Sequence, residues 1–144
     1  MNKEEKWIQS ERKRVVQYLK NNVDQYNAVG EVPAFYFYPY FAIWAIESKN
    51  CVGSVGFWVF SGDIPTDIVL RDWNDNDDNP RKALKRILKI WRKYIPYLSK
   101  GKNPPDIKMG NNIKERKEIS ELLLRRIKIL NEILKDNDVW DYNV

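Results

Sequence analysis

Histidine is absent from this sequence of 144 residues, and cysteine occurs once, at Cys51. Without histidine, neither Ser–His nor Cys–His catalysis is possible, and no zinc site can use an imidazole ligand. A single thiol forms no disulfide within the chain, which is typical of proteins from a reducing cytoplasm. We therefore expect a cytoplasmic protein with no cofactor, no metal and no catalytic residues. A binding protein is a better prediction than an enzyme.

Long apolar runs are missing too. The N-terminal stretch 1–14 is charged and lacks the apolar region of a secretory signal. The most apolar segment, 35–60, is interrupted by Pro39, Glu47 and Gly53, so it offers no span of about 20 apolar residues. No membrane contact is expected.

The composition that is present suits a folded domain. The chain has the usual length of one domain, and its hydrophobic content of 43% with 13% aromatic residues is enough for a core. We expect a single domain over 1–144. The formal net charge of +5 permits an acidic partner or nucleic acid without requiring either. The abundance of Lys, Asn and Ile expected from an AT-rich genome is an alternative source of this charge.

Three segments have apolar residues at helical spacing, and the predicted helices cover 3–28, 80–100 and about 112–136. Asn79 is the expected N-cap of the second helix, and Pro96 is its expected kink or end.

The third predicted helix has signals at both ends. Asn112 and Glu115 have the spacing of a capping box at its start. After its end, Trp140 and Tyr142 are expected to fold back onto the core.

Between the first two helices, the sequence changes to aromatic and β-branched residues. Segments 41–48 and 54–61 are predicted strands of an antiparallel hairpin, and 36–38 is a short strand that Pro39 confines to an edge. Both hairpin strands are apolar on both faces, which predicts cover by helices on both sides. The expected fold is α+β, with a small antiparallel sheet centred on a hairpin at about 41–61 and packed by three long helices.

The second predicted helix is strongly basic. It has eight Lys and Arg between 80 and 100 and no acidic residue, and a face of this kind fits a partner protein with an acidic surface. Nucleic acid is the alternative, although no RNA-recognition, KH or Cys-rich finger motif is present. The plainer interpretation is a solvated face balanced by the four Asp of 72–79. The candidate partner-binding residues are Lys82, Lys85, Arg86, Lys89, Arg92 and Lys93.

The loop 72–79 alternates Asp and Asn in the manner of a calcium loop. However, Asp77 stands where the turn glycine belongs, and Ala83 stands where the bidentate Glu belongs. We expect this loop to form turns and to cap the following helix.

Carboxylates flank the hairpin. Glu47, Asp63 and Asp67 are expected near one end of the sheet, where they would serve as a ligand or acid–base site or as a structural hub. A buried ion pair of Glu47 with Arg81 is the structural interpretation that we expect. The candidate ligand or polar-hub residues are Glu47, Asp63, Thr66, Asp67 and Arg81.

Four runs in this order, PYFAIWAIES, VGFWVFSGDIPTD, NPRKAL and PPDIKMG, carry a family resemblance. The chain resembles an uncharacterised bacterial family with runs such as PYxAIWxIES, VGWWVISGDLPTDY and HPREAL. It departs at Phe57, Ile68 and Asn79, where Trp, Tyr and His are common in that family. The resemblance implies a single cytoplasmic domain of bacterial origin and names no reaction.

The function predicted from the sequence is that of a binding or interaction protein, for example an immunity or regulatory protein that masks a partner through a charged surface. The alternatives are a small enzyme or ligand-binding protein with a carboxylate-rich site at the sheet end, and nucleic-acid binding through the basic helix 80–100. No oligomeric state is predicted.

Overall fold

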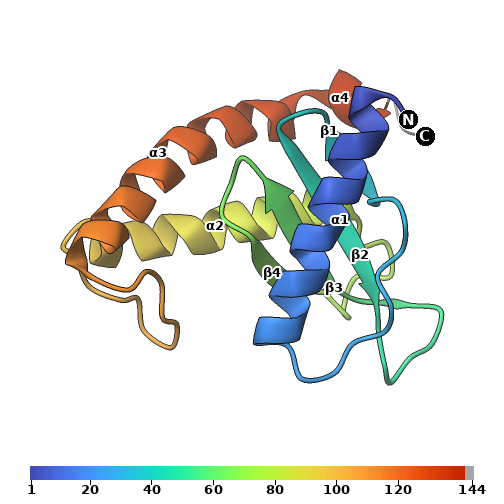
Figure 1. The fold of residues 1–144 in the computed structure, drawn as a ribbon, viewed down its shortest axis with the longest axis horizontal. Helices are drawn as coiled ribbons and strands as arrows, with labels where there is room; N and C mark the ends of the chain where they lie inside the picture. The colour runs from blue at the N-terminus through green and yellow to red at the C-terminus, as the bar shows by residue number, and fades with distance from the viewer. Residues whose placement is uncertain (142–144) are drawn as a thin grey trace. The chain divides into compact units, whose positions relative to one another are not determined.

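The structure, a computed structural model, describes residues 1–141 and divides the chain into two compact units, Met1–Ala83 and Leu84–Val144. The α+β class with an antiparallel sheet is confirmed, and Figure 1 shows the helices and strands. Within residues 1–141, no helix is both long and apolar enough to cross a membrane.

The first unit contains a four-stranded sheet in the order β1-β2-β3-β4, with every neighbouring pair antiparallel. The predicted hairpin is confirmed as β2 and β3, and the predicted edge strand is confirmed as β1, one residue earlier than expected. The fourth strand, at the other edge, was not predicted. The strands are β1 (Phe35–Phe37), β2 (Phe41–Glu47), β3 (Val55–Gly62) and β4 (Asp67–Leu70).

Helix α1 (Lys3–Asn22) covers one face of this sheet, as Figure 1 shows. Val15 and Leu19 of α1 belong to one buried cluster with Trp44 of β2 and Val59 of β3. Trp44 pairs with Val59, whereas Trp58 is one position along, so the two tryptophans lie on opposite faces. Both are buried, and they therefore belong to the core and offer no stacking surface.

The first helix is shorter than predicted. Asn2 caps its start, but Val23 is already extended, so the helix ends at Asn22 and not near residue 28. Asparagine is a poor helix former, and two of them stand at the end of α1. The following segment is tied back to the helix, because the Arg12 guanidinium donates hydrogen bonds to the carbonyl oxygens of Val29 at 2.7 Å and Gly30 at 3.0 Å.

Helix α2 (Pro80–Leu98) starts as predicted: the side-chain oxygen of Asn79 accepts from the backbone N–H of Lys82 at 3.0 Å. The expectation that the helix ends at Pro96 needs correction, since α2 continues to Leu98. A proline in the last turn removes one hydrogen bond only, so the helix tolerates it there. The apolar stripe of α2 is buried, at Leu84, Ile87, Leu88 and Trp91.

Helices α3 (Ile113–Lys135) and α4 (Asn137–Asp141) complete the second unit. The predicted cap is confirmed, because Asn112 accepts from the backbone N–H of Glu115 at 2.8 Å. Trp140 folds back as far as α3, where its indole N–H donates to the carbonyl of Ile133 at 3.0 Å. Tyr142 lies outside the described residues.

Candidate functional site

Four exposed basic side chains line one side of α2, and we call them the basic face: Lys85, Lys89, Arg92 and Lys93. Their spacing of four, seven and eight residues places them on the same side of the helix. Arg92 donates to the side chain of Asn131 at 3.3 Å. The three lysines have neither a hydrogen bond nor an ion pair with any residue of 1–141. Their charges are therefore open to a partner.

The other basic residues near the start of α2 are partly buried, at Arg81, Lys82 and Arg86. The Nζ atom of Lys82 lies 2.7 Å from Oδ2 of Asp75, so this lysine ties the preceding loop to the helix. The hydrogen bond from Lys82 lowers the pKa of Asp75, and the same bond raises the pKa of Lys82. The loop carboxylates thus neutralise the charge of Lys82, as expected, but they do not neutralise the charges of the basic face.

The loop 72–79 has the expected turn role. Its carboxylates accept backbone N–H groups within the loop, from Asn74 to Asp72 at 3.0 Å and from Asp77 to Asp75 at 2.9 Å. Asp78 accepts from the indole N–H of Trp58 at 3.0 Å and anchors the loop to β3.

Charge is divided unevenly between the two units. Leu84–Val144 contains fifteen Lys and Arg against eight Asp and Glu, a formal charge of +7. Met1–Ala83 contains ten against twelve, a formal charge of −2. The net positive charge of the chain therefore comes from the unit that carries the basic face.

The predicted carboxylate cluster at one sheet end is wrong. Phe41 pairs with Gly62 and Glu47 pairs with Val55, so Glu47 lies at the turn end of the hairpin. Asp63 and Asp67 lie at the opposite end, beyond Gly62. In an antiparallel hairpin, the end of the first strand is beside the start of the second, which separates these carboxylates by the length of the sheet.

The expected partner of Glu47 was Arg81, and the structure gives it a different one. The side-chain N–H of Asn27 donates to Oε1 of Glu47 at 2.9 Å and reaches the carbonyl of Ser48 at 3.3 Å. Asn27 is available because α1 ends early and the chain after it runs past the turn end of the sheet.

Two residues of the GDIPTD run are buried, Ile64 and Asp67. Asp67 is buried and accepts the backbone N–H of Ile68 at 2.8 Å, whereas Asp63 is exposed and Thr66 is half-buried. The backbone N–H of Asp63 donates to the carbonyl of Tyr40 at 2.8 Å. Asp67 is therefore the more deeply embedded carboxylate of the two.

The sequence reasoning missed Glu11, which lies on α1 with only 3% of its surface exposed. Its Oε2 is 3.7 Å from Nη2 of Arg14, and its Oε1 is buried with no hydrogen bond from residues 1–141. The same arginine donates to the carbonyl of Gly62 at 2.8 Å. The sequence did contain a signal that Glu11 is buried, because residue 11 falls between Ile8 and Val15 on the apolar stripe of the helix.

No three His, Cys, Asp or Glu side chains within the described range converge as a metal site would require. Comparison with known proteins gives one family, described as "Domain of unknown function (DUF4826)", whose model matches residues 2–140. No curated protein and no solved structure matches the chain.

Proposed function

The chain belongs to the DUF4826 family, and because that family is described as a domain of unknown function, we propose a function from the surface of this chain. The protein binds a partner protein with an acidic surface, and the contact is made by the basic face of α2. An immunity or regulatory protein, which acts by masking its partner in the cytoplasm, is the concrete form of this function.

The observation that carries the proposal is that Lys85, Lys89 and Lys93 have no counter-charge among residues 1–141. Like charges four residues apart on a helix destabilise it by roughly 0.2–0.5 kcal/mol per pair. Helix α2 has two such pairs among these lysines and no acidic residue to relieve them. An acidic partner surface would remove this repulsion on binding, which favours association.

A protein partner suits this face better than nucleic acid does. Three of its four members are lysines, which act as point charges and lack the planar fork with which arginine binds phosphate and guanine bidentately. Single-stranded nucleic acids also bind on exposed aromatic rings. Trp91 of α2 is fully buried, and Tyr97, four residues after Lys93, is the one exposed large aromatic side chain of the helix, so this face offers a single ring and no row of rings for successive bases.

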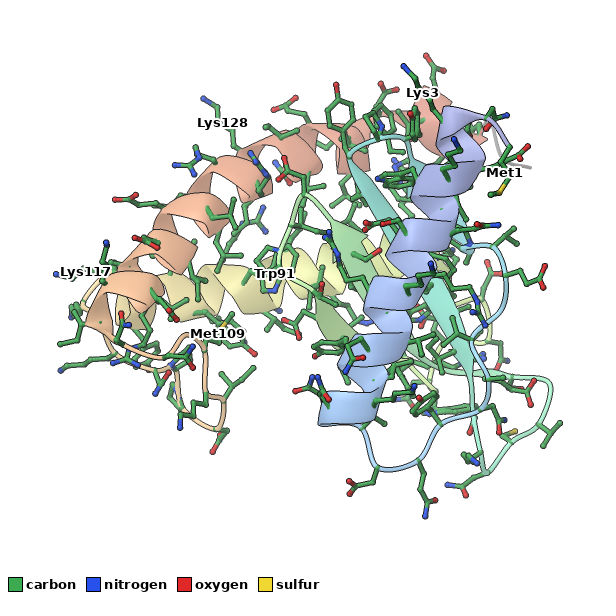
Figure 2. All side chains as sticks on the ribbon, in the orientation of Figure 1. Met1, Lys3, Trp91, Met109, Lys117 and Lys128 are labelled. Atoms are coloured by element: carbon green, nitrogen blue, oxygen red, sulfur yellow. The ribbon has the colours of Figure 1, made fainter. Side chains whose placement is uncertain are left out.

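The test compares two double variants of equal charge. Lys85→Glu with Lys89→Glu changes the basic face, and Lys117→Glu with Lys128→Glu changes two exposed lysines of α3 that Figure 2 shows projecting away from α2. The probe is labelled poly-L-glutamate, with binding followed by fluorescence anisotropy. We expect the first variant to lose about tenfold or more in affinity, which corresponds to about 1.4 kcal/mol, and the second to lose much less.

Two outcomes would contradict the proposal. Equal losses in both variants would mean that poly-L-glutamate senses only the net charge of the second unit. Tight binding of a mixed-sequence DNA duplex or RNA, with an affinity that falls steeply with salt, would assign the basic face to nucleic acid.

A further inference from the structure

An open groove of ≈ 500 Å³ lies in the first unit, at the end of the sheet where β2 turns into β3. Its walls include Glu47 from β2, Cys51 from the turn, Phe57 from β3 and Trp73 from the loop after β4. The volume is within the range of pockets that hold small organic molecules, roughly 300–1,000 Å³. The groove shares no residue with the basic face.

The carboxylate of Glu47 is held in place through one of its two oxygens, and the other oxygen is available to a ligand. Its Oε1 is held by Asn27 at 2.9 Å, which fixes the orientation of the group. Its Oε2 receives no hydrogen bond from residues 1–141, and the side chain is half-buried. A fixed, partly desolvated carboxylate oxygen is the acceptor that an organic cation needs for a charge-assisted hydrogen bond.

Trp73 provides a flat apolar wall for the same groove. Trp73 as a residue is 54% exposed, which is high for the largest apolar side chain. The guanidinium carbon of Arg71 lies 4.8 Å from the ring centroid, so Arg71 holds the ring in place. Phe57, half-buried, adds a second aromatic surface. Such walls bind a flat ring by stacking.

We propose that this groove binds a small planar organic cation, such as an aromatic amidine, with its charged group on Glu47 and its ring against Trp73. Glu47 and Lys49 are the charged residues that line the groove, and the positive guanidinium of Arg71 covers one face of the Trp73 ring, so the ligand ring stacks on the other face. Lys49 is exposed on the turn and opposes a cation, so its charge weakens binding without contributing a contact.

Benzamidine is the probe, and neutral benzamide, of nearly the same shape, is its control. Binding is followed by amide chemical shifts in the NMR spectrum of the full chain. Because Cys51 lines the groove and is the only cysteine, its rate of alkylation by iodoacetamide gives a second readout. Benzamidine should shift amides around Glu47 and Trp73 and slow the alkylation of Cys51, whereas benzamide should do neither at the same concentration.

Three variants assign the contacts. Glu47→Gln keeps an acceptor for Asn27 and should weaken benzamidine by about tenfold, the loss expected for one charge-assisted hydrogen bond. Trp73→Ala should weaken it by severalfold, since it removes the stacking wall. Lys49→Gln should strengthen it about twofold, because a nearby repulsive charge is removed.

The matched control is Glu31→Gln, which removes an acidic side chain from a different open groove of ≈ 550 Å³ lined also by Met1 and Val32. This variant should leave benzamidine binding unchanged. The proposal is overturned if Glu47→Gln binds benzamidine as tightly as the parent, if benzamide binds equally well, or if the shifted amides lie elsewhere.

Discussion

The indole Nε1 of Trp44 donates a hydrogen bond to Oγ of Ser61 at 3.0 Å, and both residues are buried. Replacing Ser61 with Ala leaves the indole N–H without an acceptor in a site closed to water. We expect Ser61→Ala to lower the free energy of unfolding by about 1–3 kcal/mol in urea titrations. Ser99→Ala is the control, because that hydroxyl is exposed at the end of α2. A loss of the same size in both variants would contradict a specific role of this bond.

Gly62 is predicted to tolerate no side chain. Its φ is +121°, and a Cβ there would collide with the carbonyl oxygen of Tyr40 and lie 2.6 Å from Cα of Phe41. Backbone strain of about 1–2 kcal/mol and overpacking of about 1–3 kcal/mol should act together in Gly62→Ala. At Gly53 φ is +88° with no atom within 4 Å, so Gly53→Ala should show the strain alone. Thermal melts that rank the two variants in the opposite order would refute this account.

The pair of Asp75 and Lys82 predicts a defined pH window. Because the pKa of Asp75 is lowered on folding, its contribution to stability is present above the unfolded value and lost as pH falls through the folded one. The pKa of Lys82 is raised, so its contribution is present below the unfolded value and lost at still higher pH. The stability difference between the parent and Asp75→Asn should therefore be constant from about pH 5 to 9.

That difference should shrink below about pH 4, where Asp75 is protonated in the unfolded chain. Melting curves at several pH values measure it directly. The control is Asp77→Asn, because the contact of Lys82 with Asp77 uses the backbone carbonyl. If the stability difference between the parent and Asp75→Asn persists unchanged at pH 2, the ion pair is not its source.

We predict that the Glu11 side chain lowers the stability of the folded protein. A buried carboxylate with an unbonded oxygen is costly, and its neighbour Arg14 is exposed and keeps its bond to Gly62 without it. We expect Glu11→Met to raise the free energy of unfolding by about 1–2 kcal/mol, measured by urea titration. Destabilisation instead would mean that the carboxylate has a structural partner. If Glu11→Met is more stable but binds its partner less tightly, Glu11 has a functional role.

The hairpin and the helix caps could be predicted from the sequence because their signals are local. Asn79, Asn112 and the turn at Gly53 act within a few residues of their own position. The fourth strand could not be recognised, since Ile68, Val69 and Leu70 are all apolar and Asp67–Leu70 therefore shows no alternation of apolar and polar residues. Its place at the edge depends on pairing with β3, which is a tertiary contact.

The site predictions failed where they depended on which ends of elements meet. The Glu47 interpretation treated the end of β2 and the end of β3 as neighbours, although an antiparallel pair separates them. The helix predicted over 3–28 includes Asn27, whereas α1 ends at Asn22 and leaves Asn27 in the segment that reaches Glu47. Asn and Asp side chains compete with helix hydrogen bonds, and the run from Asn21 to Asn27 contains several of them.

The two strands at the margins of the sheet bear on how the chain avoids aggregation. Edge strands are templates for pairing with other chains, and short edges beside prolines and charges limit that pairing. Here β1 has three residues and is followed by Pro39, while β4 has four and precedes the acidic run that starts at Asp72. Two copies that paired in parallel at β4 would bring these acidic runs side by side, so the repulsion between their carboxylates would oppose that pairing.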